Sequence, residues 1–410
     1  MLTKINHVTV YDGRGRKEED SAVVFEGRSI TAWGQDCRDM PADTEIDGRG
    51  LTVMPGWINS HVHIALDGKP NMQAQIREEN TEAQVTLSIC RNCLKTLASG
   101  IVTVRDMGTN FDASLAVRDS IAAGRTLGPR MFTSGRVICM TGGHGSDFGI
   151  EADGVDATRK AARTQIKKGV DLLKIMATGG GQSKGMSAGA TQLTESEIAA
   201  IVEEAKKAGF PTAAHAQGKE GVMNCLRAGV ESIEHGVFLD EEQVELMAKN
   251  NTFFCATLLP PYYVVRYGEE NGIPPYVVKK CAGQLEAHLK SFELAVKSGL
   301  RIIAGNDAGT PFNNHDDMVN EYKMMAELGM PVRDIITATT YTAAQAVRAE
   351  SQIGSIEPGK LADFTIVEGD PEQDINAFGR VRMVYKEGRK LFAMEHGKPW
   401  FAAERQEAEI

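Results

Sequence analysis

The side chains that could do chemistry begin with two histidines, His61 and His63, in the segment MPGWINSHVHIALDG. Residues two apart on an extended strand point to the same face, so at a strand end both imidazoles could bind one metal ion. The apolar run at 51–54 predicts that strand, with an irregularity at Pro55 and Gly56. Two hydrogen-bonded structural histidines would give the same pattern, so the pair needs support from the rest of the chain.

Lys174 interrupts an apolar segment, DLLKIMA, that predicts a strand. A lysine is rarely buried without a partner. A lysine that faces metal can react with carbon dioxide, and the resulting carbamate has two anionic oxygens that can bridge two cations. The alternative is a lysine at a strand end whose ammonium group reaches solvent.

Three further candidates come at the ends of predicted strands. His215 ends the segment PTAAH, His235 ends SIEH, and Asp307 follows IIAGN. Each has an ordinary structural explanation, which is a hydrogen-bonded histidine or, for the aspartate, a helix N-cap. The arrangement of the strands therefore decides between these explanations and a shared site.

The elements that would position these residues are strands and helices in alternation. Helices are predicted between several of the strands, and one of them is opened by the capping signal TESE at 194–197. Together with the strand that ends at His61 there are eight predicted strands, the number that closes a parallel (β/α)8 TIM barrel. The other seven are predicted at 101–105, 130–134, 172–177, 212–216, 232–235, 252–257 and 301–305.

TIM-barrel enzymes hold their active sites at the carboxyl ends of the strands. Five different strands place a nitrogen or carboxylate ligand at that end, and five independent coincidences are improbable. Imidazole, carboxylate and carbamate ligands suit zinc or a similar first-row ion. Two such cations, ~3.5–4 Å apart, can activate a bridging hydroxide and polarise a carbonyl. The pattern predicts metal-assisted hydrolysis.

Both ends of the chain differ from this central region. Short strands separated by turns are predicted at 5–10, 21–26, 29–32 and 44–47, and strands return after about residue 354. We expect residues 1–54 and 354–410 to form a composite small β domain, a β-sandwich built from both termini. It would flank a catalytic barrel of residues 55–353, which gives an α/β fold overall.

Composition narrows the possible partners. The chain of 410 residues has a formal net charge of −10 and no basic cluster, which argues against nucleic acid and anionic membranes as partners. Its first residues are strand-like, with no apolar signal segment, and no span is long enough to cross a membrane. Seven scattered cysteines do not suggest a disulfide framework, so we expect a reducing, cytoplasmic location.

Loops after the predicted strands supply candidates for substrate binding. His144 lies in the glycine-rich segment TGGHG, where backbone can approach a ligand closely, and a flexible loop with an incidental histidine is the alternative. Tyr262 and Tyr263 follow two prolines after the seventh strand, and either could contact substrate or pack. The glycine-dense run at 179–189 suggests a mobile lid or an ordinary long loop.

Other charged residues in these strands are expected to be structural. Arg105 and Asp106 end the second barrel strand, where an internal ion pair that braces the barrel is the preferred interpretation. Glu234 precedes His235, and strand alternation predicts that it points away from that histidine.

The ordered motifs PGWINSHVH, LLKIMATGG, AAHAQG, IEHG and AGNDAG resemble the metal-dependent amidohydrolase superfamily. Within it, they resemble the branch of prolidase-like (Xaa-Pro) dipeptidases and imidazolonepropionase relatives. The tail SIEPGKLADFTIVEGDP is similar to the flanking sheet of that superfamily. The resemblance covers nearly the whole chain and is much less specific for substrate than for superfamily.

The resemblance implies a role for each candidate. Asp307 would join one histidine pair on the first metal and shuttle a proton from the bridging hydroxide to the leaving amine. Carboxylated Lys174 would bridge the two metals and so take part in catalysis. The ligands of the first metal would be His61, His63 and Asp307, and those of the second His215 and His235. Asn306 departs from the small hydroxyl residue often found in relatives, which affects the orientation of the aspartate.

The function implied is a binuclear hydrolase of a C–N bond with two divalent ions, zinc by preference. Dipeptides or N-acyl amino acids are the expected small-molecule substrates, and a homo-oligomer is typical of the superfamily. One alternative is a mononuclear hydrolase of cyclic amides or a deaminase of heterocycles, which dispenses with a bridging lysine. Another is a non-catalytic scaffold, which the presence of all six ligand candidates disfavours.

Overall fold

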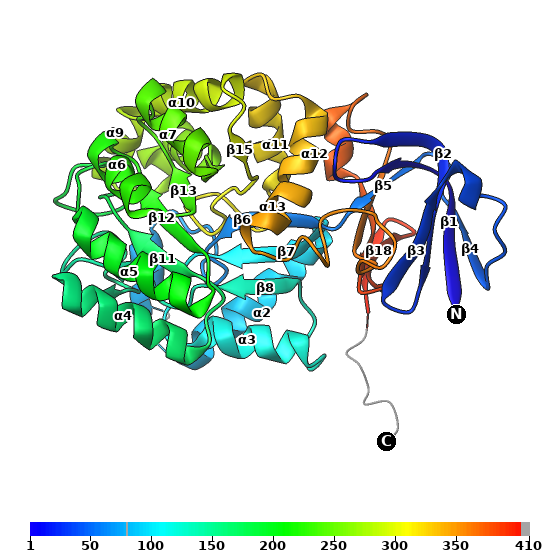
Figure 1. The fold of residues 1–410 in the computed structure, drawn as a ribbon, viewed down its shortest axis with the longest axis horizontal. Coiled ribbons are helices and arrows are strands. Elements are labelled where there is room, and N and C mark those ends of the chain that lie inside the picture. The colour runs from blue at the N-terminus through cyan, green and yellow to red at the C-terminus, as the bar shows by residue number, and fades with distance from the viewer. Residues whose placement is uncertain (79–80, 403–410) are drawn as a thin grey trace.

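A computed structural model describes residues 1–78 and 81–402, so the last part of the expected terminal domain, residues 403–410, lies outside the described residues. In the described residues, strands from both ends of the chain form one nine-stranded sheet, seen at one end of the molecule in Figure 1. Its order is β19-β18-β17-β16-β5-β1-β2-β3, and β4 pairs with β1. The strands are β1 (Leu2–Tyr11), β2 (Lys17–Glu26), β3 (Ser29–Gly34), β4 (Thr44–Asp47), β5 (Leu51–Pro55), β16 (Phe364–Glu368), β17 (Val381–Lys386), β18 (Arg389–Glu395) and β19 (Lys398–Phe401).

The two chain ends meet in the middle of this sheet. Strand β16 pairs antiparallel with β5, and β5 in turn pairs with β1. This pairing joins the strands of both termini in one hydrogen-bonded sheet, and the β-sandwich arrangement of these strands stays a prediction. Its core includes Phe25, Phe364 and Tyr385, with the rings of Phe25 and Phe364 5.5 Å apart.

The central residues form two parallel sheets. The smaller has the order β6-β7-β8 and the larger the order β10-β9-β11-β12-β13-β14-β15. The strands are β6 (Trp57–Val62), β7 (Ile101–Asp106), β8 (Arg130–Thr133), β9 (Ile138–Cys139), β10 (Ile150–Glu151), β11 (Leu173–Met176), β12 (Thr212–Ala216), β13 (Ser232–His235), β14 (Phe253–Cys255) and β15 (Arg301–Ile302).

Backbone hydrogen bonds join these two sheets at both ends. The Asp171 N–H, just before β11, donates to the carbonyl of Thr133 in β8 at 2.9 Å. Across the other junction the Ser60 N–H of β6 donates to the Ala304 carbonyl at 2.9 Å, and Val62 forms a parallel bridge with Ala308. The strand that carries the first histidine pair therefore lies beside the segment after β15.

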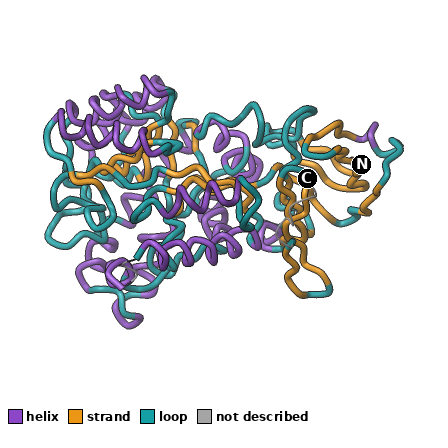
Figure 2. The backbone as a smooth tube through the Cα atoms, turned by 90° about the horizontal axis from the view of Figure 1, so that it is seen from below, coloured by secondary structure: helices purple, strands orange, loops and turns teal. Residues whose placement is uncertain are grey.

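Helices alternate with the parallel strands and lie around them, whereas the terminal sheet lies at the other end of the molecule (Figure 2). The α-helices are α1 (Met72–Glu78), α2 (Glu82–Ala98), α3 (Ala113–Ala122), α4 (Val155–Lys168), α5 (Glu195–Ala208), α6 (Lys219–Ala228), α7 (Glu241–Asn250), α8 (Leu259–Tyr267), α9 (Pro275–Ala282), α10 (Leu285–Lys297), α11 (Met318–Glu327), α12 (Val332–Ala338) and α13 (Tyr341–Ala346). Short 3-10 helices cover Gln35–Cys37, Glu269–Asn271 and Ile375–Gly379. Among the described helices, none has both the length and the apolar character needed to cross a membrane.

Local sequence signals explain several of these boundaries. Thr194 caps α5 in a capping box with Glu197, as the signal TESE predicts, and Gly209 ends the helix in the left-handed conformation. One prediction needs correction. The apolar run at 51–54 does not continue into the strand of the histidines, because β5 ends at Pro55 and belongs to the terminal sheet. Gly56 separates it from β6, where a Cβ would lie only 2.7 Å from Val102.

Candidate metal centre

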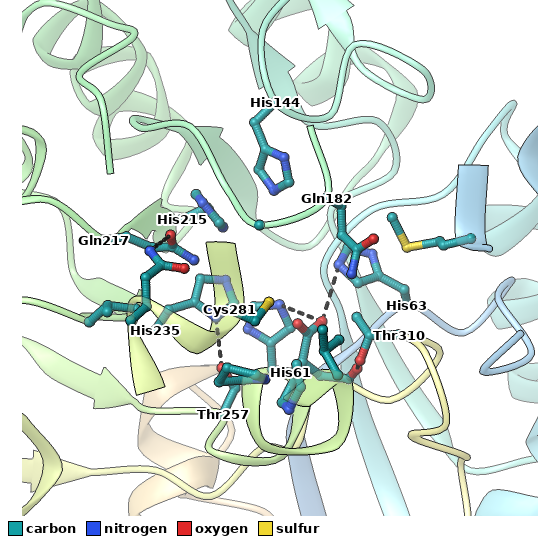
Figure 3. Close-up of a pocket in the computed structure, with 18 of the residues that line it drawn as sticks. His61, His63, His144, Gln182, His215, Gln217, His235, Thr257, Cys281 and Thr310 are labelled. Atoms are coloured by element: carbon teal, nitrogen blue, oxygen red, sulfur yellow. Dashed lines mark hydrogen bonds and ion pairs between the residues drawn. The ribbon is translucent and has the colours of Figure 1, made fainter. Parts of the chain in front are cut away.

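The six predicted ligands, which come from strands far apart in the sequence, line one cavity (Figure 3). They come from β6, β11, β12, β13 and the segment after β15. Lys174 lies inside β11 as its second residue, whereas the other five lie near or beyond the carboxyl ends of their strands. The empty volume of the cavity is about 820 Å³ including its open mouth. The residues are His61, His63, Lys174, His215, His235 and Asp307.

The first histidine pair converges on Asp307. The Oδ1 atom of Asp307 lies 3.5 Å from His61 Nε2 and 3.4 Å from His63 Nε2. The other ring nitrogens are already engaged: His61 Nδ1 lies 2.8 Å from Glu234 Oε2, and His63 Nδ1 donates to the Gly108 carbonyl at 3.1 Å. Donation from Nδ1 leaves an unprotonated Nε2 on each ring, which is the form that binds a metal.

The second pair, His215 and His235, is arranged in a similar way. Their ring centroids lie 4.5 Å apart, and the His235 ring is 5.1 Å from that of His61. His215 Nε2 donates to the Gly179 carbonyl at 3.3 Å, which leaves Nδ1 free to bind a metal. The Thr257 hydroxyl donates to the Ala256 carbonyl and so accepts from His235 Nδ1 at 2.6 Å, which leaves Nε2 free.

Lys174 is almost fully buried, and its Nζ has no hydrogen-bond partner among the described residues. Burial lowers the pKa of Lys174 to about 8, although Glu234 and Asp307 attract the charged form. Burial likewise raises the pKa of Asp307 to about 8, although Lys174 opposes that shift. A buried polar atom without a hydrogen-bond partner costs free energy, so Lys174 and Asp307 lack a partner that the folded protein needs.

This incompleteness tests whether the residues fit a cation. Within the described residues, His61 Nε2, Lys174 Nζ and Asp307 Oδ1 all lack hydrogen-bond partners. Ligand atoms of His61, His63 and Asp307 lie within 4.8 Å of one another. Two neutral imidazoles and a carboxylate are a normal donor set for zinc and similar ions, so the residues fit a divalent metal.

Backbone strain marks the same place. His235, Thr257 and Asp307 have φ values of 71°, 53° and 57°, in the left-handed region that non-glycine residues rarely adopt. His235 ends β13, whereas Thr257 lies two residues after β14 and Asp307 five residues after β15, so all three are on the carboxyl side of adjacent strands. Strained backbone of this kind clusters at functional sites, where the surrounding fold maintains it.

Glu234 has a role beyond the structural one predicted for it. It is fully buried, and its carboxylate contacts both His61 Nδ1 and the Arg105 guanidinium, with Arg105 Nη2 2.8 Å from Oε1. The internal ion pair expected for Arg105 is therefore present, and its partner is Glu234. Asp106 instead accepts hydrogen bonds from Thr109 and Thr133. Glu234 and His235 both approach the His61 ring, which lies 5.1 Å from the His235 ring, because the left-handed backbone at His235 interrupts the strand alternation.

His144 lines the cavity, as predicted for a substrate-binding residue. Its ring lies 4.3 Å from that of His215, and its Nδ1 is 2.7 Å from the Ser183 hydroxyl of the glycine-rich loop. Burial lowers the pKa of His144 to about 3, so the ring is neutral near pH 7. Its uncharged ring can donate or accept one hydrogen bond toward the cavity.

The two tyrosines lie elsewhere. Tyr262 and Tyr263 are on α8, and neither is among the residues that line this cavity. The Tyr263 hydroxyl donates to Asp317 at 2.5 Å, and Tyr262 accepts from Arg266 at 2.8 Å. The prolines at 260 and 261 begin a helix where a loop was expected, because proline is favoured in a first helical turn. The helix turns Pro260, Pro261 and Val264 toward the cavity instead.

Sequence reasoning also missed several neutral residues of the cavity wall. They come from loops and helices whose orientation a single sequence does not reveal, and no periodic signal distinguishes them. They are Gln182, Gln217, Thr257, Gln284, His288 and Thr310.

Comparisons with known proteins agree with this arrangement. Ochratoxinase of Aspergillus niger is 28% identical over 95% of this chain and 86% of its own length. Imidazolonepropionase of Micrococcus luteus is 25% identical over 95% of this chain and 96% of its own. The crystal structure of a Xaa-Pro dipeptidase with methionine bound in its active site is 32% identical, covers 95% of this chain and 99% of its own, and superposes with a TM-score of 0.88. The family model of the amidohydrolase family matches residues 52–391, so the chain belongs to the amidohydrolase family and is similar to its prolidase-like members.

Proposed function

We propose that this amidohydrolase is a metal-dependent enzyme that cleaves the C–N bond of a small amide, with dipeptides and N-acyl amino acids as substrate classes. The observation that carries the proposal is the convergence of six candidate ligands on one cavity, three of them with buried atoms that lack partners. The similarity to a Xaa-Pro dipeptidase and to ochratoxinase supports the amide bond as the target.

Two divalent ions, zinc by preference, would occupy the centre. His61, His63 and Asp307 would hold one ion, His215 and His235 the other, and Lys174, carboxylated by carbon dioxide, would lie between them. When bound, such ions supply Lewis acidity toward a carbonyl oxygen and make water acidic enough to act as a nucleophile near neutral pH. The lowered pKa of Lys174 supports carboxylation, because carbon dioxide reacts with the neutral amine.

The residues themselves would do three things. Asp307 would take a proton from water at Oδ1 and pass it to the departing nitrogen, since a carboxylate beside a metal-activated water can act first as base and then as acid. His144 would orient the substrate through its free ring nitrogen, opposite the nitrogen that contacts Ser183. Glu234 would keep Nδ1 of His61 protonated, so that the ring presents Nε2 to the ion.

The fold that supports this chemistry is proposed to be a closed (β/α)8 barrel of residues 55–353. The hydrogen bonds that join the two parallel sheets at both ends support closure. The flanking unit would comprise residues 1–54 and 354–410, as the pairing of β5 with β16 supports.

A second candidate function rests on one observation. Among the described residues, ligand atoms within 4.8 Å of one another include His61, His63 and Asp307 but not the second histidine pair. A mononuclear hydrolase of cyclic amides or a deaminase of heterocycles needs a compact site of this kind. In that case Lys174 would be a structural lysine.

Metal analysis of protein purified without chelator, combined with a ninhydrin screen of dipeptides and N-acyl amino acids, separates the candidates. About two ions per chain with release of free amino acid is the result expected for the binuclear amide hydrolase. One ion per chain and no amino acid released would favour the mononuclear alternative. A chain that binds no metal would contradict both.

A further inference from the structure

The wall of the cavity beyond the candidate ligands is largely apolar. Leu66, Met72 and Phe148 form one part, with the Phe148 ring 5.6 Å from that of His63. Helices α8 and α9 supply another part through Val264 and Cys281, together with the prolines at 260 and 261. A wall of this composition stabilises apolar groups on the substrate, because they leave water when they bind.

The polar part of the wall carries no fixed charge. Gln284 donates to Gln217 through Nε2 at 3.0 Å, so one amide oxygen and one amide N–H₂ group remain for a ligand. His144 and His288 lie on the same wall, and His288 Nε2 already donates to the Ala256 carbonyl at 2.8 Å. Among the described residues that line the cavity, none is an arginine or a glutamate, and the two charged types, Lys174 and Asp307, belong to the proposed metal centre.

The wall of the cavity favours a negatively charged group on the substrate over a positively charged one. The carboxylate of an amino acid can accept hydrogen bonds from the Gln217 amide and from the ring of His144. An ammonium or guanidinium group would find no carboxylate other than Asp307, which the proposed centre already uses. A buried cation without a counter-charge is strongly disfavoured.

We propose that the substrate is an N-acylated amino acid with an apolar side chain, and that the cavity excludes amides that carry an ammonium or guanidinium group. This inference rests on the proposed hydrolase function and narrows its substrate class. It favours N-acyl amino acids over dipeptides with a free amino terminus, and apolar side chains over lysine or arginine.

The first test compares matched amides with the full chain loaded with zinc. We expect kcat/KM for N-acetyl-methionine and N-acetyl-phenylalanine to exceed that for N-acetyl-lysine and N-acetyl-arginine by about a hundredfold or more. Equal rates, or faster cleavage of the basic amides, would overturn the inference and leave the hydrolase function intact.

Binding measured separately keeps the two proposals distinguishable. If no amide is cleaved, the proposed function fails, and calorimetry with N-acetyl-methionine and N-acetyl-lysine still decides the inference. At least about tenfold tighter binding of N-acetyl-methionine would support it. Equal binding, or no binding of either compound, would overturn it.

A negative charge introduced into the cavity tests whether the lack of carboxylates in its wall causes the discrimination against basic amides. Gln284→Glu is nearly isosteric and should raise the N-acetyl-lysine to N-acetyl-methionine ratio of kcat/KM by about tenfold. Ala282→Glu is the control, because Ala282 is exposed at the end of the neighbouring helix α9 and adds the same charge outside the cavity. If Gln284→Glu does not fold, Cys281→Asp places a charge on the same wall. An unchanged ratio in the folded cavity variant would overturn the inference.

Discussion

The two halves of the candidate centre differ in the groups that contact the histidine ring nitrogens facing away from the cavity. In the half of His61 and His63, one ring contacts a carboxylate, Glu234, which is itself paired with Arg105. In the half of His215 and His235, the partners are a carbonyl and a hydroxyl, which carry no charge. A carboxylate partner makes an imidazole a stronger ligand than a neutral partner does. We therefore expect the first half to bind its metal more tightly than the second.

The largest expected effect comes from Asp307, which belongs to the first half but serves the reaction. Asp307→Asn should lower kcat by about 10³-fold, because the amide cannot carry the proton, while metal content stays close to that of the native chain. Parallel measurements of turnover and of metal per chain check this. Retained activity would rule out the proposed proton transfer.

Lys174 is expected to connect the two halves. Lys174→Ala should empty at least one metal position, with partial recovery of metal and activity when short carboxylic acids are added. If the comparison is correct, the second half loses its metal first. Full occupancy in the variant without any effect of added acid would contradict the carbamate.

Glu234 tests the charged support of the first half. Glu234→Gln should weaken the tighter metal position by about 10- to 100-fold, since the amide no longer favours the required imidazole form. Competition with a chelator measures this without relying on activity. Glu231→Gln is a suitable control, because Glu231 pairs with Arg348 at the surface, away from the cavity.

Thr257 tests the neutral support of the second half. Thr257→Val keeps the shape of the side chain and removes the hydroxyl that contacts His235. We expect the weaker metal position to lose about tenfold in affinity, at the lower limit for residues that support a ligand. A loss larger than that of Glu234→Gln would reverse the comparison between the two halves.

Acid should act on both halves alike, because burial is the main cause that lowers the pKa of the histidines in each half. Burial lowers the pKa values of His63, His288 and His315 to about 4, below the value of about 6.5 for an unfolded histidine. Between these values the unfolded chain binds more protons, so stability is present above pH 6.5 and falls as the pH drops toward 4. Denaturant unfolding of metal-free protein at pH 7 and pH 5 measures the slope. His315→Gln, outside the centre, should reduce it by up to about 1.4 kcal/mol per pH unit.

The sequence was sufficient to predict that the six candidate ligands share one cavity, because parallel strands bring their carboxyl ends together. Their role as metal ligands stays a prediction. Alternation along a strand could not reveal that Glu234 contacts His61, since the two lie on different strands. Nor could it reveal that His235 ends its strand in the left-handed conformation, which depends on the surrounding fold. The sequence predicts that the tyrosines lie in a loop after the seventh strand, next to two prolines. In the structure the same prolines begin α8.

The contact between β6 and the segment after β15 also determines when, during folding, the proposed metal centre can form. The Asp307 N–H donates to the carbonyl of His61, and the His63 N–H donates to the carbonyl of Ala308. During synthesis, His61 and His63 leave the ribosome long before Asp307. Most of the chain must be made before this carboxylate can join the two histidines. Such distant contacts form late and slow folding. Full occupancy by metal would therefore report that the last parallel strand has docked against the first.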